Sequence, residues 1–214
     1  MKKKLILIIL SFFLIFQKST SKEIKIFDFT EDGLKKLKVR KLKGETSYTI
    51  GSNANGNYLK AEAKGKASGL GMEKIINLNE TPYINITWKV EKDLSGINEK
   101  SKKGHDYAAR VFVVKQTGVT ALSKKAMNYV FSSNNKIDEN WRSPFTKKSV
   151  DYVLSTTLEN SNEWVTVKAN VKEHFKKFHD LDVNEIEGVA IMTDTDNSKL
   201  TATSYYQNIF FSSE

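Results

Sequence analysis

Two short polar blocks at the ends of apolar runs carry the residues of this chain best suited to chemistry. Residues 104–110 lead into the apolar run 111–114, and residues 193–197 follow the apolar run 189–192. An unpaired ion is costly to bury, so charges at the entrance or exit of a core strand must be paired or used to bind a ligand. The candidate ligand-binding residues in these blocks are Asp106, Tyr107, Arg110, Asp194, Asp196 and Asn197.

The spacing of the first block limits how its charges can pair. If residues 106–114 form a strand, Asp106 and Arg110 share a face but lie roughly 13 Å apart, at about 3.3 Å per residue. Arg110 therefore needs a carboxylate from elsewhere in the chain or an anionic ligand, and Asp194 and Asp196 are the obvious partners. The spacing leaves two interpretations open: an Arg–carboxylate pair that ties two strands together, or a ligand site.

Other chemistries are considered for the same residues. Asp194 and Asp196 followed by Asn197 could offer oxygen ligands to a calcium-like cation, but Lys199 and Tyr205 stand where an EF-hand needs glycine and glutamate. We therefore predict no resident metal or cofactor, with a calcium-like cation as an open alternative. His174 and His179 are five residues apart and do not share a helical face, which excludes a two-histidine zinc site.

The elements that must position these blocks are mostly strands. Residues 83–90 alternate strictly between apolar and polar, which predicts a strand with one buried face. Similar strands are predicted at 23–29, 48–50, 58–63, 108–115, 127–132, 150–156, 164–170, 187–193 and 204–212. A helix is predicted at 171–178 and a further helical turn at 124–127. The pattern predicts an all-β, antiparallel β-sandwich with one or two short helices. Trp88 and Trp164 are expected in its core.

The N-terminal segment has the layout of a secretory signal. Lysines at positions 2–4 precede an apolar stretch at 5–16, and small residues stand at 19 and 21. We expect a signal peptide at residues 1–21 and a single domain at 22–214, without a membrane span after cleavage and located in the periplasm or secreted.

The number and distribution of charged residues indicate which partners the protein can bind. The net charge of +9 includes the basic leader, and the remaining lysines are interspersed with acids, whereas a nucleic-acid-binding protein would cluster them. We expect no nucleic-acid partner. The chain has no cysteine, so its stability does not depend on disulfides.

Several motifs resemble a known family, domain of unknown function 3047, which is found in exported bacterial proteins. They are Ala67-Ser68-Gly69-Leu70, Ile86-Thr87-Trp88-Lys89-Val90, residues 104–111, Asn128-Tyr129-Val130-Phe131, Trp164 and residues 193–197. The resemblance implies a jelly-roll sandwich similar to galactose-binding domains, without an established activity. His105 replaces the aspartate that is usual in that family, and Val167 and Ala169 stand where glutamate and arginine are usual.

The best hypothesis from sequence is a binding module for a glycan, or another anionic or envelope ligand, at the two polar blocks. One alternative is a hydrolase or lyase acting on polysaccharide, with Asp106 and Asp194 as paired acids and His105 assisting. The other is a non-catalytic structural or adaptor domain, in which both blocks form ion-pair networks.

Overall fold

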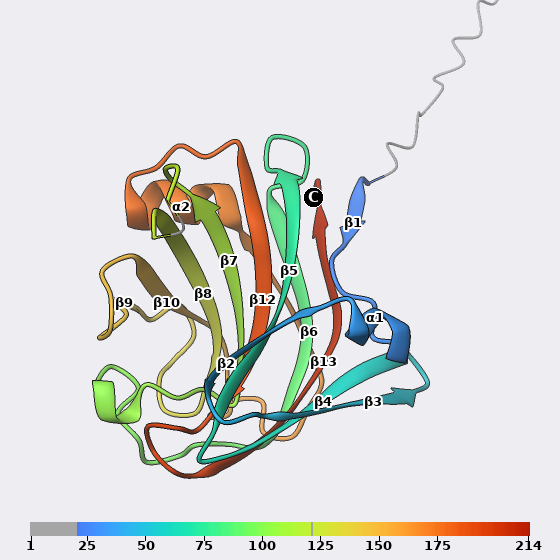
Figure 1. Ribbon diagram of the computed structural model, residues 1–214, viewed down its shortest axis with the longest axis vertical. Coiled ribbons are helices and arrows are strands. Elements are labelled where there is room, and N and C mark those ends of the chain that lie inside the picture. The colour runs from blue at the N-terminus through green and yellow to red at the C-terminus, as the bar shows by residue number, and fades with distance from the viewer. Residues whose placement is uncertain (1–20, 121) are drawn as a thin grey trace, which may run out of the picture.

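Strands with one apolar face pack into two β-sheets that enclose the core (Figure 1). The computed structural model describes residues 21–120 and 122–214. Sheet A has the order β11–β6–β13–β4–β3, and β1 also pairs with β13. Its strands are β1 (Glu23–Lys25), β3 (Ser47–Asn53), β4 (Gly56–Lys64), β6 (Tyr83–Lys92), β11 (Val165–Asn170) and β13 (Thr201–Ser212).

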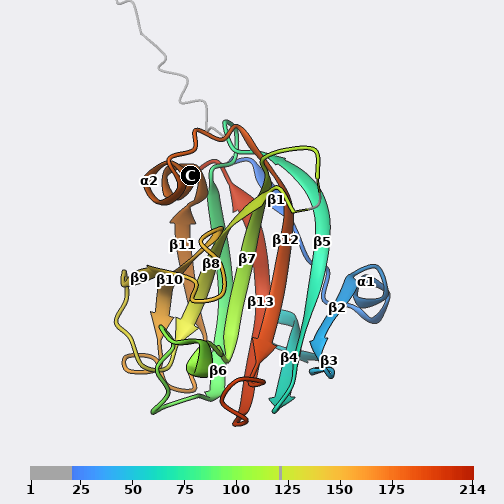
Figure 2. The same ribbon diagram turned by 60° about the vertical axis from the view of Figure 1, so that its left-hand side comes forward.

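Sheet B has the order β2–β5–β12–β7–β8–β10–β9. Its strands are β2 (Lys38–Lys43), β5 (Ala67–Asn77), β7 (Ala109–Gln116), β8 (Lys124–Ser132), β9 (Asn140–Arg142), β10 (Ser149–Thr156) and β12 (Glu185–Asp194). Figure 2 shows β5, β12, β7 and β8 running side by side in this layer. All pairs in both sheets are antiparallel except β8 with β10, which are parallel because the long segment between them crosses back and contributes β9.

Two helices complete the fold. α1 (Glu31–Lys35) begins at Thr30, whose side chain accepts a hydrogen bond from the Gly33 backbone N–H. α2 (Val171–His179) begins at Asn170, which caps the backbone N–H of Glu173, and it buries Val171 and Phe175. The predicted helix at 171–178 is therefore confirmed. The turn predicted at 124–127 is wrong, because these residues pair with β7 as the first part of β8.

The two sheets are joined by buried aromatic residues that carry a polar group. Trp88 of β6 is fully buried, and its indole N–H donates to Ser155 Oγ of β10 at 2.9 Å. The Tyr206 hydroxyl of β13 donates to the Met192 carbonyl of β12 at 2.8 Å and accepts from the Arg110 N–H at 3.2 Å. These hydrogen bonds join the two sheets across the core and hold them in position relative to each other.

The jelly-roll sandwich expected from the sequence is confirmed, but it contains elements that were not predicted. β2, β5, β9 and α1 were not predicted. The predicted signal peptide falls mainly on residues 1–20, outside the described residues. Neither helix in the described chain has the length and apolar character that a membrane crossing requires.

Candidate functional site

The structure brings Arg110 and Asp194 together at one end of sheet B. β7 and β12 are neighbours, and Arg110 lies opposite Met192, two residues before Asp194. The Arg110 Nη2 atom donates to Asp194 Oδ2 at 2.6 Å, and the two side chains are only 6% and 1% exposed. The guanidinium also lies 5.2 Å from the ring centre of Tyr107 and 5.1 Å from that of Phe112. Of the two partners that the sequence suggested for Arg110, Asp194 forms the pair.

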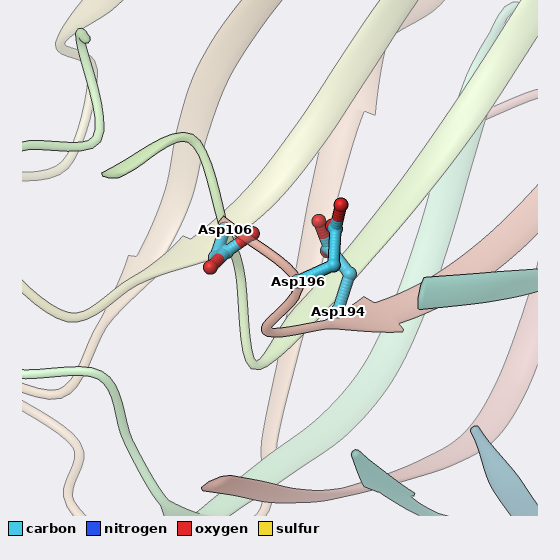
Figure 3. Close-up of side chains that lie close together, drawn as sticks. All are labelled: Asp106, Asp194 and Asp196. Carbon is cyan, nitrogen blue, oxygen red and sulfur yellow. The ribbon is translucent and has the colours of Figure 1, made fainter. Parts of the chain in front are cut away.

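Asp106 lies close to Asp194 and Asp196 (Figure 3). Its carboxylate nevertheless has other partners. Asp106 precedes β7, because the strand begins only at Ala109. Its carboxylate accepts hydrogen bonds from the Asn197 side-chain amide at 2.8 Å, the Asn197 backbone N–H at 3.1 Å and the Ser198 backbone N–H at 2.6 Å. Asp106 thus holds the turn that follows β12 against the segment that precedes β7.

The cluster is rich in carboxylates. Side-chain oxygens of Asp106, Asp194 and Asp196 lie within 4.8 Å of one another. Burial raises the pKa of Asp194, the Arg110 guanidinium opposes this rise, and the Asp106 carboxylate adds to it. Arg110 already supplies a positive charge here, and the backbone N–H groups already satisfy Asp106. The arrangement is therefore an ion-pair junction, and it differs from an open set of oxygen ligands.

The six residues expected to contact a ligand are brought together, but they differ in exposure. Asp106, Tyr107, Arg110 and Asp194 are buried, whereas Asp196 and Asn197 are partly exposed. Asp106 and Asp194 are respectively 0% and 1% exposed, so a polysaccharide cannot reach both acids unless the surrounding loops move.

A second buried polar contact adjoins the first block. His105 Nε2 lies 2.7 Å from Asp151 Oδ2 of β10, and the Asn128 side-chain amide of β8 donates to the other oxygen of Asp151. Among the described residues, the Tyr107 hydroxyl, the Arg110 Nε and the Asn128 Oδ1 have no hydrogen-bond partner. Sequence analysis did not predict Asp151 as a partner of His105 and included Asn128 only in a family motif, because only the tertiary pairing of β8, β10 and the loop before β7 brings them to His105.

An aromatic cluster lies on the other sheet. Tyr58 of β4, Trp164 immediately before β11, and Tyr205 of β13 are all partly exposed on the outer face of sheet A. Their ring centres are 5.9 Å apart for Tyr58 and Trp164, 5.4 Å for Tyr58 and Tyr205, and 6.0 Å for Trp164 and Tyr205. The rings pack edge to face or tilted, the arrangement that aromatic quadrupoles favour. We call these three side chains the aromatic cluster.

Charged and small residues surround the aromatic cluster. In the register of sheet A, Tyr205 stands between Lys60 of β4 and Lys89 of β6. The Tyr205 hydroxyl donates to Glu91 at 2.6 Å. Gly51 of β3 lies opposite Tyr58, and a Cβ atom there would come within 2.5 Å of the Tyr58 ring. The glycine therefore leaves the space in which this ring lies.

The expectation that Trp164 belongs to the core is wrong, whereas that for Trp88 is confirmed. β11 directs Val165, Val167 and Ala169 inward, opposite Trp88, Ile86 and Ile84 of β6. Trp164 has the parity of the exposed Thr166 and Lys168, so it lies on the outer face. The sequence already indicated this orientation. The apolar residues of the strand stand at 165, 167 and 169, so position 164 belongs to the opposite face.

Comparisons with solved structures show the fold. The family 30 carbohydrate-binding module of the cellulosomal cellulase Cel9D-Cel44B of Clostridium thermocellum is similar to this chain, with a TM-score of 0.52 and 10% identity, over 90% of this chain and 98% of that one. A cellulase derived from Cel12A of Rhodothermus marinus has the same TM-score of 0.52 and 10% identity, over 90% of this chain and 100% of that one. The glycoside hydrolase domain of Endo-D from Streptococcus pneumoniae R6 gives a TM-score of 0.44 and 10% identity over 83% of this chain, which spans 22% of that longer chain.

Comparison of sequences identifies the family. The sequence profile described as protein of unknown function DUF3047 matches residues 32–210, and the chain therefore belongs to this family. The resemblance stated from the motifs is confirmed. No curated protein matches the chain.

Proposed function

We propose that this member of the DUF3047 family is an exported, non-catalytic binding module for a glycan, and that the outer face of sheet A is its binding surface. The observation that carries the proposal is the aromatic cluster of Tyr58, Trp164 and Tyr205, which lies partly exposed on a regular sheet. Export through the N-terminal segment is part of the same proposal. The likeness in fold to a carbohydrate-binding module and a cellulase supports it.

The chemistry of this face suits a sugar. Apolar C–H faces of a pyranose ring pack on aromatic rings, while its hydroxyls need hydrogen-bond partners. In the described chain, the Trp164 indole N–H makes no hydrogen bond to another residue, so it is free to donate to a hydroxyl. The ammonium of Lys89 and the carboxylates of Glu62 and Glu91 line the same face.

In this proposal, the polar blocks identified from the sequence support the fold and do not contact the glycan. Four of the six candidate residues are buried against one another. The Arg110–Asp194 pair and the bonds from Asp106 to the turn after β12 hold the ends of β7 and β12 in place. The acids needed for a hydrolase are engaged in these bonds, which favours a module without turnover.

The test compares alanine substitutions in the aromatic cluster with a matched substitution outside it. A glycan array, followed by calorimetric titration with the oligosaccharides that bind, measures affinity for the wild-type protein, Trp164→Ala and Tyr58→Ala. Loss of one aromatic contact at the centre of a binding site costs about 2 kcal/mol, or roughly 30-fold in affinity. We expect such a loss for Trp164→Ala. The control is Phe145→Ala, which removes an aromatic side chain that is 55% exposed on the segment between β9 and β10.

Gly51→Ala gives a second and subtler test. The added methyl group would meet the Tyr58 ring at 2.5 Å and displace it, so we expect a several-fold loss of affinity although the substituted residue itself contacts no ligand. Unchanged affinity in Trp164→Ala and Gly51→Ala would contradict the proposed surface. Release of new reducing ends from a bound polysaccharide would contradict the non-catalytic role.

A further inference from the structure

We propose that the glycan bound on sheet A is acidic, and that Lys89 recognises a carboxylate group of the sugar chain. This inference rests on the proposed function, because it names the class of ligand for the same surface. The observations that carry it are the position of Lys89, its lack of an acidic partner and the charges of the residues around it.

Lys89 lies in the middle of the aromatic cluster. It is directly opposite Tyr205 in the pairing of β6 with β13, and its Nζ atom is 5.3 Å from the centre of the Tyr205 ring. Trp88 pairs with Val165 of β11, so Lys89 is also beside Trp164, the residue immediately before that strand. A sugar packed on Tyr205 or Trp164 would therefore bring its substituents next to this ammonium.

The two glutamates beside Tyr205 on this face are already engaged. Glu62 forms a salt bridge with Lys60 at 3.0 Å, and Glu91 accepts the hydrogen bond from Tyr205. Over the described part of the chain, no carboxylate lies within salt-bridge distance of Lys89, although this side chain is only partly exposed. An ammonium that is partly removed from water and has no counter-ion attracts an anion.

The rest of the outer face adds to this attraction. Lys64 of β4 and Lys168 of β11 also point outward and are exposed, and Lys168 lies over the Tyr83 ring at 5.0 Å. On the strands of this face, the lysines Lys25, Lys60, Lys64, Lys89 and Lys168 outnumber the glutamates Glu23, Glu62 and Glu91. A carboxylate on the sugar would find a positive potential at the place where the rings would hold the chain, and this favours an acidic polysaccharide over a neutral one.

The experiment uses pairs of polysaccharides that differ only in charge. Polygalacturonate is compared with its methyl ester, and carboxymethyl cellulose with hydroxyethyl cellulose, by affinity electrophoresis and calorimetry on the full domain. We expect the wild-type protein to bind the acidic member of at least one pair about tenfold more tightly, since a hydrogen bond between charged groups is stronger than one between neutral groups. This preference should weaken with salt and disappear in Lys89→Met, which keeps the apolar stem.

Two control variants separate Lys89 from nonspecific attraction. Lys177→Met removes an ammonium that lies 5.1 Å from the Phe178 ring on α2, which is not a strand of sheet A. The double variant Arg40→Ser/Lys43→Ser removes charge from β2, an exposed basic edge strand that could bind any polyanion. Both should keep the tenfold preference, and a DNA duplex should not compete for binding.

The outcomes distinguish the inference from the proposed function. Equal binding of acidic and neutral members, unaffected by Lys89→Met but lost in Trp164→Ala, overturns the acidic ligand and leaves the glycan-binding surface intact. A preference for the acidic polysaccharide that survives Lys89→Met but is lost in Arg40→Ser/Lys43→Ser also overturns the inference. Competition by a DNA duplex as strong as that by the acidic polysaccharide does so too. Failure of both pairs and of the array to bind removes the proposed function, and the inference with it.

Discussion

Replacing Arg110 with methionine tests whether the polar blocks act as a structural junction. The methionine keeps an apolar stem between the Tyr107 and Phe112 rings but removes the guanidinium from Asp194. Asp194 is then left as a buried carboxylate that has lost its charged partner. The two side chains are 6% and 1% exposed, so the energy of a buried pair applies, and breaking it costs about 3–5 kcal/mol.

This loss should be visible in thermal and chemical unfolding. For a domain of this size, 1 kcal/mol shifts the melting temperature by about 2–4 °C, so we expect a fall of roughly 6–20 °C. Urea unfolding followed by tryptophan fluorescence gives the free energy directly. The matched control is Arg40→Met on the exposed strand β2, which should change stability by less than about 0.5 kcal/mol.

The double variant Arg110→Met/Asp194→Asn keeps the test informative if the single variant is too unstable to purify. It removes the orphaned charge together with its partner, and we expect it to be more stable than Arg110→Met alone. A cost below about 1 kcal/mol for Arg110→Met, or a double variant less stable than the single one, would refute the reasoning. If a folded variant lost its glycan binding, the polar blocks would be the binding site after all.

Two further predictions concern the core and the response to pH. Trp88→Phe removes the indole hydrogen bond to Ser155 across the two sheets and leaves a small cavity, so we expect a loss of about 2–3 kcal/mol in urea unfolding, and near-neutral behaviour would contradict the role of this bond. Burial and the neighbouring Lys177 lower the pKa of His174 to about 4, below the value of about 6.5 in an unfolded chain. The unfolded state therefore takes up the proton first, so stability is full above pH 6.5 and falls as the pH decreases towards 4. Because the side chain is partly exposed, we expect a loss of about 1–2 kcal/mol, and His174→Gln should flatten this part of the profile.

The sequence predicted the strands that carry a clear alternation. Residues 83–90 lie within β6, because strict apolar–polar periodicity has one solution on a pleated sheet. It missed β5, whose segment 67–77 contains small residues and glycines that show no period but pair on both sides with β2 and β12. It also missed β2, an edge strand exposed along its length, which needs no buried face.

For the candidate site, too, the sequence indicated some features and the structure was needed for others. The types and spacing of its residues indicated that Arg110 needs a carboxylate from another strand or an anionic ligand, with Asp194 and Asp196 as candidate partners, and the structure pairs it with Asp194. Spacing could not say whether the pair would be open or sealed. That depends on the segments packed around it, and the structure buries four of the six candidate residues.

By itself, the sequence determined the class of this protein: an all-β sandwich with charges at its strand ends that must be paired or used, and a member of the DUF3047 family. The sandwich follows from local strand periodicity, the expectation for the charges follows from the cost of burying an ion, and the family follows from sequence motifs. Only the tertiary structure decided which aromatic residues face outward together, because Tyr58, Trp164 and Tyr205 are far apart in sequence and meet through the pairing of β4, β13, β6 and β11. Strand order across a sheet is set by long-range packing, and no local pattern encodes it.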